Sequence, residues 1–240
     1  MPPIQISEQR GVRYLHFGSE LVQGAMRIAR PWSLELEYTR EMMLPLILRP
    51  ARWPASVLQL GLGTGSITKF LHRHRPRAKI TVVEILPAVE AAARQYFKVP
   101  DNSPRLRVEI GEGHEYVACA RRTHDFVVVD GFDGEGRAGM LTTTPFYANC
   151  RGCLADGGMV AINLIDRGGG VKGSIERLRA AFDGQVLVLP RYKGGNTVAL
   201  ACAGEMALPA PEALHAAARK LKADTGLDLA PTLERLADVP

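Results

Sequence analysis

The sequence predicts an α/β protein built on a mostly parallel β-sheet with helices on both faces. Strand-like and helix-like segments alternate from residue 33 to about residue 203, which is the order that parallel strands and crossover helices require. The chain has 240 residues, of which 46% are hydrophobic, and this is enough for a full core. Alternating runs precede the central region and a helical pattern follows it, so we expect two small appendages.

The first appendage, residues 1–32, is predicted to be a small β domain. Apolar and polar residues alternate in "VRYLHF" and in "ELVQGAMRI", and "GS" separates the two runs. Alternation with a period of two around a glycine turn is typical of a β-hairpin. We therefore expect two paired strands in this part of the chain.

The central segment, residues 33–204, is predicted to form the main sheet and its helices. Apolar runs rich in β-branched residues predict strands, and apolar residues three or four apart predict helices. The predicted strands cover residues 56–60, 79–84, 106–110, 125–130 and 158–164, with two more near 185–190 and 197–202. The predicted helices cover residues 33–48, 65–74, 87–96, 112–120, 144–154 and 171–182.

The second appendage, residues 205–240, is predicted to be a helical tail that docks on the sheet domain. The segment "PEALHAAARKLKADTG" has an apolar stripe at helical spacing. This stripe consists of Leu214, Ala217, Ala218 and Leu221. Gly226, directly after Thr225, is a typical helix stop.

Composition excludes several classes of protein. No segment approaches the roughly 18 consecutive apolar residues of a membrane span, and the N-terminus lacks the apolar run of a signal peptide. We therefore expect a cytoplasmic protein without a membrane partner. The 30 basic and 25 acidic residues are interspersed, for a net charge of +5, so a nucleic-acid partner is not expected. The densest basic run, "HRHRPRAK", is interpreted as a solvated helix end and loop.

The four cysteines do not predict a disulfide framework or a metal site. They are Cys119, Cys150, Cys153 and Cys202. Cys150 and Cys153 form a CxxC pair, but neither a second pair nor a nearby histidine pair completes a zinc site. We interpret the pair as part of a buried helix.

The stretch "VLQLGLGTGSITKFL" raises the question of a ligand. Gly61, Gly63 and Gly65 follow a predicted strand and lead into a predicted helix, so that a ligand could approach the backbone and the free N–H groups of the helix. A tight turn without a ligand explains these glycines equally well. Glu84, at the tip of the next strand and 23 residues beyond Gly61, is where an acid accepts hydrogen bonds from ribose hydroxyls. Together the two features predict a nucleoside site.

Two further predicted strands also end in acids. Glu112 follows the third strand, and Asp130 and Asp133 follow the fourth. The carboxyl ends of parallel strands meet at one edge of a sheet, which is the edge where open α/β sheets bind ligands. A cluster of acids at this edge favours a cationic ligand such as a sulfonium or an amine.

Asp130 is our candidate for a catalytic base. Displacement at a carbon next to a sulfonium releases a neutral thioether, but the attacking amine must first lose its proton. For an alkylamine with a pKa near 10 this costs about 4 kcal/mol at pH 7. Asp130 can accept this proton, and Asp133 can anchor an ammonium group. Capping of a turn is the structural alternative for both residues.

The glycine-rich loop of residues 131–147 is predicted to cover the ligand. Phe132, Met140 and Leu141 would supply apolar contacts. A plain connection between two elements is the alternative interpretation.

Six blocks of sequence together resemble the spermidine synthase family, the polyamine aminopropyltransferases. The blocks are "VLQLGLGTGS", "VVEILP", "GEGHEYV", "HDFVVVDGFDGEG", "PFYANCRGCLADGGMVAIN" and "GNTVALAC". The resemblance extends from about residue 12 to residue 203, and the order and spacing of the blocks make it more specific than any single one.

The resemblance implies a Rossmann-like class I S-adenosylmethionine-type fold with seven strands, a small N-terminal β domain and usually a homodimer. It implies decarboxylated S-adenosylmethionine as donor, a small-molecule diamine or polyamine as acceptor, and no metal. By match to the family, Gln23 is the glutamine of the β domain, Tyr38 lies in the "Y-x-E-M" block, and Asp130 is the acid beside the attacking amine. Glu84 is the ribose-binding acid and Glu112 the acid near the adenine. The implied donor-binding residues are Gly61, Gly63, Thr64, Gly65, Glu84, Ile85, Glu112 and Gly113, and the implied acceptor-binding residues are Gln23, Tyr38 and Asp133.

Thr64 keeps two other hypotheses open. In the family, the glycine turn carries an aspartate that holds the ammonium group of the donor, and Thr64 stands at this position. Loss of the acid makes room for the carboxylate of intact S-adenosylmethionine, which favours a methyltransferase that acts on a small or basic acceptor. A nucleoside-binding protein that has lost its reaction is the third hypothesis, since fold alone does not choose among activities.

Overall fold

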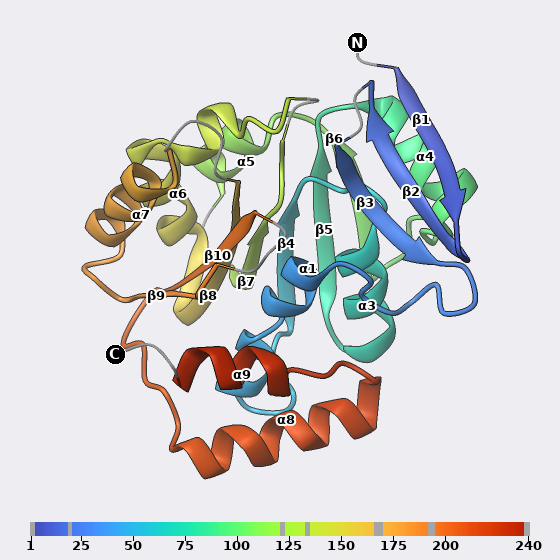
Figure 1. Ribbon diagram of the computed structural model, residues 1–240. Helices are drawn as coiled ribbons and strands as arrows, with labels where there is room; N and C mark the ends of the chain where they lie inside the picture. The colour runs from blue at the N-terminus through green and yellow to red at the C-terminus, as the bar shows by residue number, and fades with distance from the viewer. Residues whose placement is uncertain are drawn as a thin grey trace.

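A computed structural model confirms the predicted fold class (Figure 1). It describes residues 3–18, 21–120, 123–132, 135–165, 170–191 and 195–237. A seven-stranded sheet forms the centre of the molecule, helices flank it on both sides, and a three-stranded sheet lies beside it.

The small sheet contains the predicted hairpin and one strand more. Strands β1 (Ile4–Gln9), β2 (Val12–Phe17) and β3 (Val22–Arg27) pair in this order, and both pairs are antiparallel. The predicted runs correspond to β2 and β3, whereas β1 is mostly exposed and lacks a strong apolar pattern. Arg10 and Gly11 join β1 to β2 with positive φ angles of 50° and 74°, as a tight hairpin turn of the primed type requires.

The order of strands in the central sheet creates the crevice of the molecule. The strands are β4 (Ser56–Leu60), β5 (Lys79–Glu84), β6 (Leu106–Ile110), β7 (His124–Val129), β8 (Leu154–Ile165), β9 (Val186–Val188) and β10 (Asn196–Cys202). Their order is β6-β5-β4-β7-β8-β10-β9, in which β10 is antiparallel to both neighbours and the other pairs are parallel. The chain runs outward from β4 to β6 and then returns to β7 on the other side of β4. The carboxyl ends of β4 and β7 therefore border the position at which such sheets bind ligands.

Helices cover both faces of this sheet (Figure 1). They are α1 (Glu37–Glu41), α2 (Pro45–Leu48), α3 (Ser66–His74), α4 (Pro87–Phe97), α5 (Gly113–Cys119), α6 (Thr144–Cys153) and α7 (Gly170–Ala181), with a 3₁₀ turn, η1, at Gly139–Thr142. Two clusters of buried side chains, one on each face, form the core. One of them contains Leu15 of β2, Phe126 of β7 and Leu221 of the tail. The predicted domain boundaries after residues 32 and 204 stay a prediction, since this cluster joins all three parts.

The predicted helix at residues 33–48 is wrong in one respect, because the structure has two short helices there. Pro45 is the cause. Proline has no N–H group, so it cannot donate the helical hydrogen bond to the carbonyl of Glu41. The N–H of Leu44 donates to that carbonyl instead, at 2.9 Å. Helix α1 therefore ends, and α2 begins after a turn.

The tail contains the predicted helix and a second one. Helix α8 (Pro211–Thr225) ends at Gly226, whose φ of 78° is left-handed, so the predicted stop is confirmed. Helix α9 (Ala230–Ala237) follows. The two helices lie together at one end of the molecule, with α9 on the side of the sheet (Figure 1).

All four cysteines are free thiols, and Cys150 and Cys153 are buried in α6. Among the helices of the described residues, none is long and apolar enough to cross a membrane.

Lys69 of α3 should make stability depend on pH. This side chain is fully buried, and its Nζ donates to the carbonyl of Phe97 at 2.6 Å. Burial, reinforced by Lys98, lowers the pKa of Lys69 from 10.5 to about 7. Between these values the unfolded chain holds a proton that the folded chain has released, so Lys69 makes stability rise with pH in this window.

We therefore expect the Lys69→Met variant to lack this contribution. As the pH rises from 7 to 10, the wild type should gain stability that the variant does not gain. The free energy of unfolding of the variant should therefore fall behind that of the wild type by up to about 1.4 kcal/mol per pH unit. Urea unfolding at pH 6, 8 and 9.5 measures the difference. A difference that does not change with pH would show that Lys69 titrates normally.

Candidate functional site

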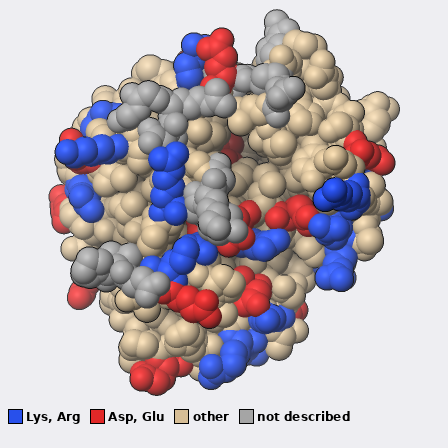
Figure 2. Space-filling model, viewed as in Figure 1, with Lys and Arg blue, Asp and Glu red and all other residues tan. Residues whose placement is uncertain are grey.

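A cavity of about 870 Å³ opens at the carboxyl ends of β4, β5 and β7. Its walls come from β3, α1, the ends of these strands and the segment after β7. On the face of the molecule shown in Figure 2, basic and acidic side chains are intermixed. A cavity of this size is typical of a small-molecule site.

The glycine turn after β4 holds two strand ends in close contact. Gly61, Gly63 and Gly65 have φ angles of 88°, 53° and 63°, a region that glycine adopts without the steric cost that a Cβ atom brings. A Cβ atom on Gly61 would lie 2.2 Å from the carbonyl oxygen of Asp130. The backbone of Gly61 and Gly63 consequently forms part of the cavity wall.

Thr64 and Gly65 do not line this cavity. The side chain of Thr64 is 3% exposed and faces β3, where a Cβ atom on Gly24 would lie 2.6 Å from its Cγ2. The hydroxyls of Thr64 and Ser66 are 2.8 Å apart, and that of Ser66 donates to the carbonyl of Ala25. The structure thus places the Thr64 side chain between the turn and the small sheet.

Glu84 is fixed at the end of β5. The residue is 6% exposed, and its carboxylate accepts hydrogen bonds from the backbone N–H groups of Leu62 (2.8 Å) and Leu86 (2.9 Å). Burial raises the pKa of Glu84, and the backbone hydrogen bonds oppose this rise. A carboxylate has about four lone-pair positions, so Glu84 can also accept from a ligand. The exposed side chain of Ile85 continues the same wall with apolar surface.

Glu112 and Gly113 lie at the start of α5. Glu112 is the N-cap residue, and its Oε2 lies 3.4 Å from Nδ1 of His114. All three residues line the cavity. They form a polar edge beside the wall that Glu84 and Ile85 make.

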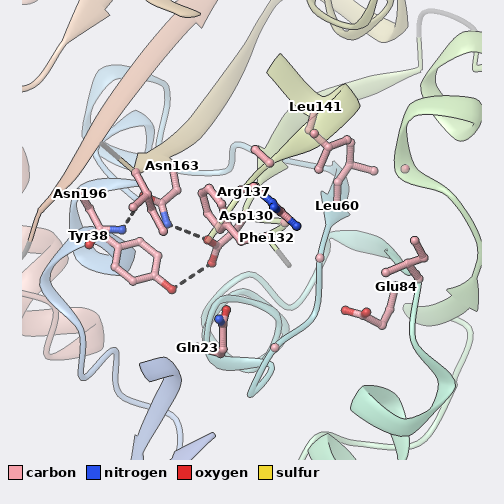
Figure 3. A pocket seen from close by; sticks show the side chains of 18 of the residues that line it. Gln23, Tyr38, Leu60, Glu84, Asp130, Phe132, Arg137, Leu141, Asn163 and Asn196 are labelled. Atoms are coloured by element: carbon pink, nitrogen blue, oxygen red, sulfur yellow. Dashed lines mark hydrogen bonds between the residues drawn. The ribbon is translucent and has the colours of Figure 1, made fainter. Parts of the chain in front are cut away.

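Asp130, directly after β7, is the centre of a hydrogen-bonded group (Figure 3). Its Oδ2 accepts from the hydroxyl of Tyr38 at 3.2 Å, and its Oδ1 accepts from Nδ2 of Asn163 at 2.9 Å. The Oδ1 of Asn163 in turn accepts from Nδ2 of Asn196 at 2.8 Å. Burial raises the pKa of Asp130 to about 6, against the effect of the two hydrogen bonds. Asp130 is therefore mostly ionised at neutral pH and able to accept a proton.

The structure brings most of the predicted site residues into this one cavity. They are Gln23, Tyr38, Gly61, Gly63, Glu84, Ile85, Glu112, Gly113 and Asp130. Asp133 lies outside the described residues. Phe132, Met140 and Leu141 also line the cavity, as expected for an apolar cover. In Figure 3, Tyr38, Asp130 and Asn163 are grouped together and Glu84 lies away from them.

The sequence analysis missed many of the lining residues, among them His114, Arg137, Asn163 and Asn196. Asn163 carries a signal, because it is a single amide within the apolar run "MVAINLI". Arg137 pairs with Glu135 at 2.5 Å in the loop after β7. Within the described ranges, no group of three or more His, Cys, Asp or Glu residues is arranged to hold a metal ion.

The strand order, the glycine turn after β4 and the acid at the end of β5 define a Rossmann-like α/β protein. Comparison with known proteins gives the family. The model of the spermine/spermidine synthase domain matches residues 36–163. A polyamine aminopropyltransferase of Chromobacterium violaceum is 35% identical over 98% of this chain and 90% of its own length. The chain belongs to the spermine/spermidine synthase family.

Two solved structures share the fold. A probable spermidine synthase of Corynebacterium glutamicum has a TM-score of 0.77 at 20% identity, over 91% of this chain and 83% of its own. The human methyltransferase-like protein 13 in complex with SAH has a TM-score of 0.68 at 25% identity, over 80% and 93% of the two chains. The fold therefore occurs in proteins named for two different transfer reactions.

Proposed function

We propose that this protein transfers an aminopropyl group from decarboxylated S-adenosylmethionine to a diamine or polyamine. One observation carries the proposal: a carboxylate held by Tyr38 and Asn163 faces the same cavity as a second carboxylate, Glu84, at the carboxyl edge of the sheet. The name of the relative from Chromobacterium violaceum supports the same reaction.

In the proposed complex, the donor occupies the wall made by β4, β5 and α5. Its ribose hydroxyls donate to Glu84, and its adenine lies against Ile85 with its polar edge toward Glu112. The exposed side chains of Ile85 and Met140 supply apolar surface for the ring. The sulfonium then points toward Asp130, on the opposite part of the cavity.

The proposed reaction is a single displacement. The lone pair of the acceptor nitrogen attacks the aminopropyl carbon next to the sulfonium, the carbon–sulfur bond breaks, and its electron pair stays on sulfur. Asp130 accepts the proton from the attacking amine and orients that amine through its fixed oxygens. The products are a lengthened polyamine and the neutral thioether methylthioadenosine.

Product analysis tests the proposal. The purified protein is incubated with decarboxylated or intact S-adenosylmethionine and with a set of diamines, and mass spectrometry identifies the products. We expect aminopropylated amine and methylthioadenosine from the decarboxylated donor. A methylated amine from the intact donor would instead establish the methyltransferase hypothesis. Binding of both donors without turnover would establish a protein that has lost its reaction.

Glu84→Ala should weaken nucleoside binding. We expect the dissociation constant of methylthioadenosine to rise at least tenfold, about 1.4 kcal/mol, because the ribose loses its charged acceptor. Titration calorimetry measures the constant. Glu109→Ala serves as the control, since Glu109 lies on β6, pairs with Arg107 of the same strand and does not line the cavity. Equal affinity in both variants would remove Glu84 from the site.

We also propose, from the family resemblance, that the protein is a cytoplasmic homodimer. Light scattering of the purified protein determines the oligomeric state, and a single species of 26.1 kDa would contradict the dimer.

A further inference from the structure

We propose that Asn196 is a positioning residue for this site: by donating to Asn163, it directs the Asn163 amide nitrogen toward Asp130 and so holds that carboxylate oriented and ionised for the acceptor amine. The proposal rests on the proposed function. Its basis is the hydrogen-bonded series from Nδ2 of Asn196 to Oδ1 of Asn163 (2.8 Å) and from Nδ2 of Asn163 to Oδ1 of Asp130 (2.9 Å).

The two ends of the Asn163 amide are chemically different, and each has a partner that suits it. If the amide were rotated by half a turn, its oxygen would face an oxygen of Asp130, and its NH₂ group would face the NH₂ group of Asn196. The rotated form thus sets acceptor against acceptor and donor against donor. Asn163 is 3% exposed, so water offers little relief for these contacts. Removal of Asn196 leaves only Asp130 to determine the orientation.

The sheet topology places Asn196 within hydrogen-bonding distance of Asn163. Strand β10 is antiparallel to β8, with Val198 opposite Asn163 and Asn196 opposite Ile165. Asn196 lies two residues from Val198, so Asn196 and Asn163 are diagonal neighbours on one face of the sheet. Asn196 also lines the cavity.

Besides Asn163 of β8, four segments contribute groups to the surroundings of Asp130. Tyr38 from α1 donates to its other oxygen. The strand before the glycine turn contributes backbone, with the N–H of Asp130 donating to the carbonyl of Leu60. The loop after β7 brings Arg137 into the same cavity, and Glu84 at the end of β5 lines it as well. Of the groups that contact Asp130, the Asn163 amide is the one whose orientation depends on a residue of a neighbouring strand, Asn196 of β10.

Two isosteric variants test the inference. Asn196→Leu removes the donor, and Asn196→Asp replaces it with an acceptor that attracts the Asn163 nitrogen away from Asp130. We expect the acidic limb of the kcat profile to move up by about one pH unit in Asn196→Leu and further in Asn196→Asp. Because the pKa of Asp130 is about 6, a rise of one unit lowers kcat at pH 7 roughly twofold in Asn196→Leu, and Asn196→Asp should lower it more. The KM of the donor should stay unchanged. Thr197→Val is the matched control, since Thr197 is the next residue of β10 and faces the opposite side of the sheet.

A second measurement does not depend on turnover. Carboxyl-labelled aspartate gives a carbon NMR signal for Asp130, which Asp130→Asn identifies by its loss. The titration midpoint of this signal should rise in both Asn196 variants and stay at the wild-type value in Thr197→Val. Wild-type midpoints in both Asn196 variants would overturn the inference. If the wild type shows no aminopropyl transfer, the proposed function fails, and the NMR titration still decides the role of Asn196.

Discussion

Asp130→Asn is expected to lower aminopropyl transfer by about 10²–10⁴-fold, the usual contribution of a positioned base. The amide has the shape of the carboxylate, and it can keep both hydrogen bonds: its oxygen accepts from Asn163, and its NH₂ group donates to the hydroxyl of Tyr38. The fold and the affinity for methylthioadenosine should therefore stay close to the wild type. A steady-state assay and calorimetry on the same preparation separate turnover from binding.

The pH profile gives a sharper form of this prediction. Because burial raises the pKa of Asp130 to about 6, the wild-type rate should fall as the pH decreases through this value and the carboxylate gains a proton. Asp130→Asn should lack that acidic limb. Asp224→Asn, which changes an exposed acid of α8 that pairs with Lys220, should keep the wild-type rate and profile. A normal rate in Asp130→Asn would remove Asp130 as the base.

Arg235→Ala is expected to lower the free energy of unfolding by about 3 kcal/mol, because it leaves a buried charge without its partner. Arg235 of α9 forms an ion pair with Glu41 of α1, which is 1% exposed. The Arg235 side chain is 24% exposed, so we expect the lower end of the roughly 3–5 kcal/mol that the loss of one partner of a buried ion pair costs. Thermal unfolding should occur roughly 6–12 °C lower for a chain of this size.

Two controls separate this charge effect from a general weakening of the tail. Lys220→Ala breaks an exposed pair with Asp224 on α8, and exposed pairs contribute less than about 1 kcal/mol. Burial raises the pKa of Glu41, and Arg235 opposes this rise. Without Arg235, Glu41 should gain a proton at higher pH, so the loss of stability should shrink as the pH falls. A loss equal to that of Lys220→Ala, or one independent of pH, would contradict the assignment.

Arg235 also links the C-terminal tail to the site. Its Nη1 lies 3.7 Å from Glu37, and both Glu37 and Glu41 line the cavity. Helix α1 carries Tyr38, which donates to Asp130. The tail is thus in contact with the helix that holds one of the two donors on Asp130.

Several features of the site could be predicted from local sequence. The glycine turn, Glu84 at a strand end and Asp130 at another are each recognisable within a few residues, and parallel strands place their carboxyl ends at one edge. Asn163 gave only a weak signal, and Asn196 gave none, because an amide at a strand end is common. Their importance depends on the pairing of β8 with β10, two strands between which the chain forms α7 and β9.

The sequence by itself determined the alternation of strands and helices in the central segment, the glycine turn, the acids at the strand ends and the stop of α8 at Gly226. These features depend on the period of apolar residues and on the backbone preferences of glycine, which act over a few neighbouring residues. The tertiary structure alone decided that Thr64 faces the small sheet and that Arg235 reaches Glu41 across 194 positions of the chain. Contacts of this kind are decided by which elements pack together, and a buried polar group takes whichever partner that packing brings within hydrogen-bonding distance.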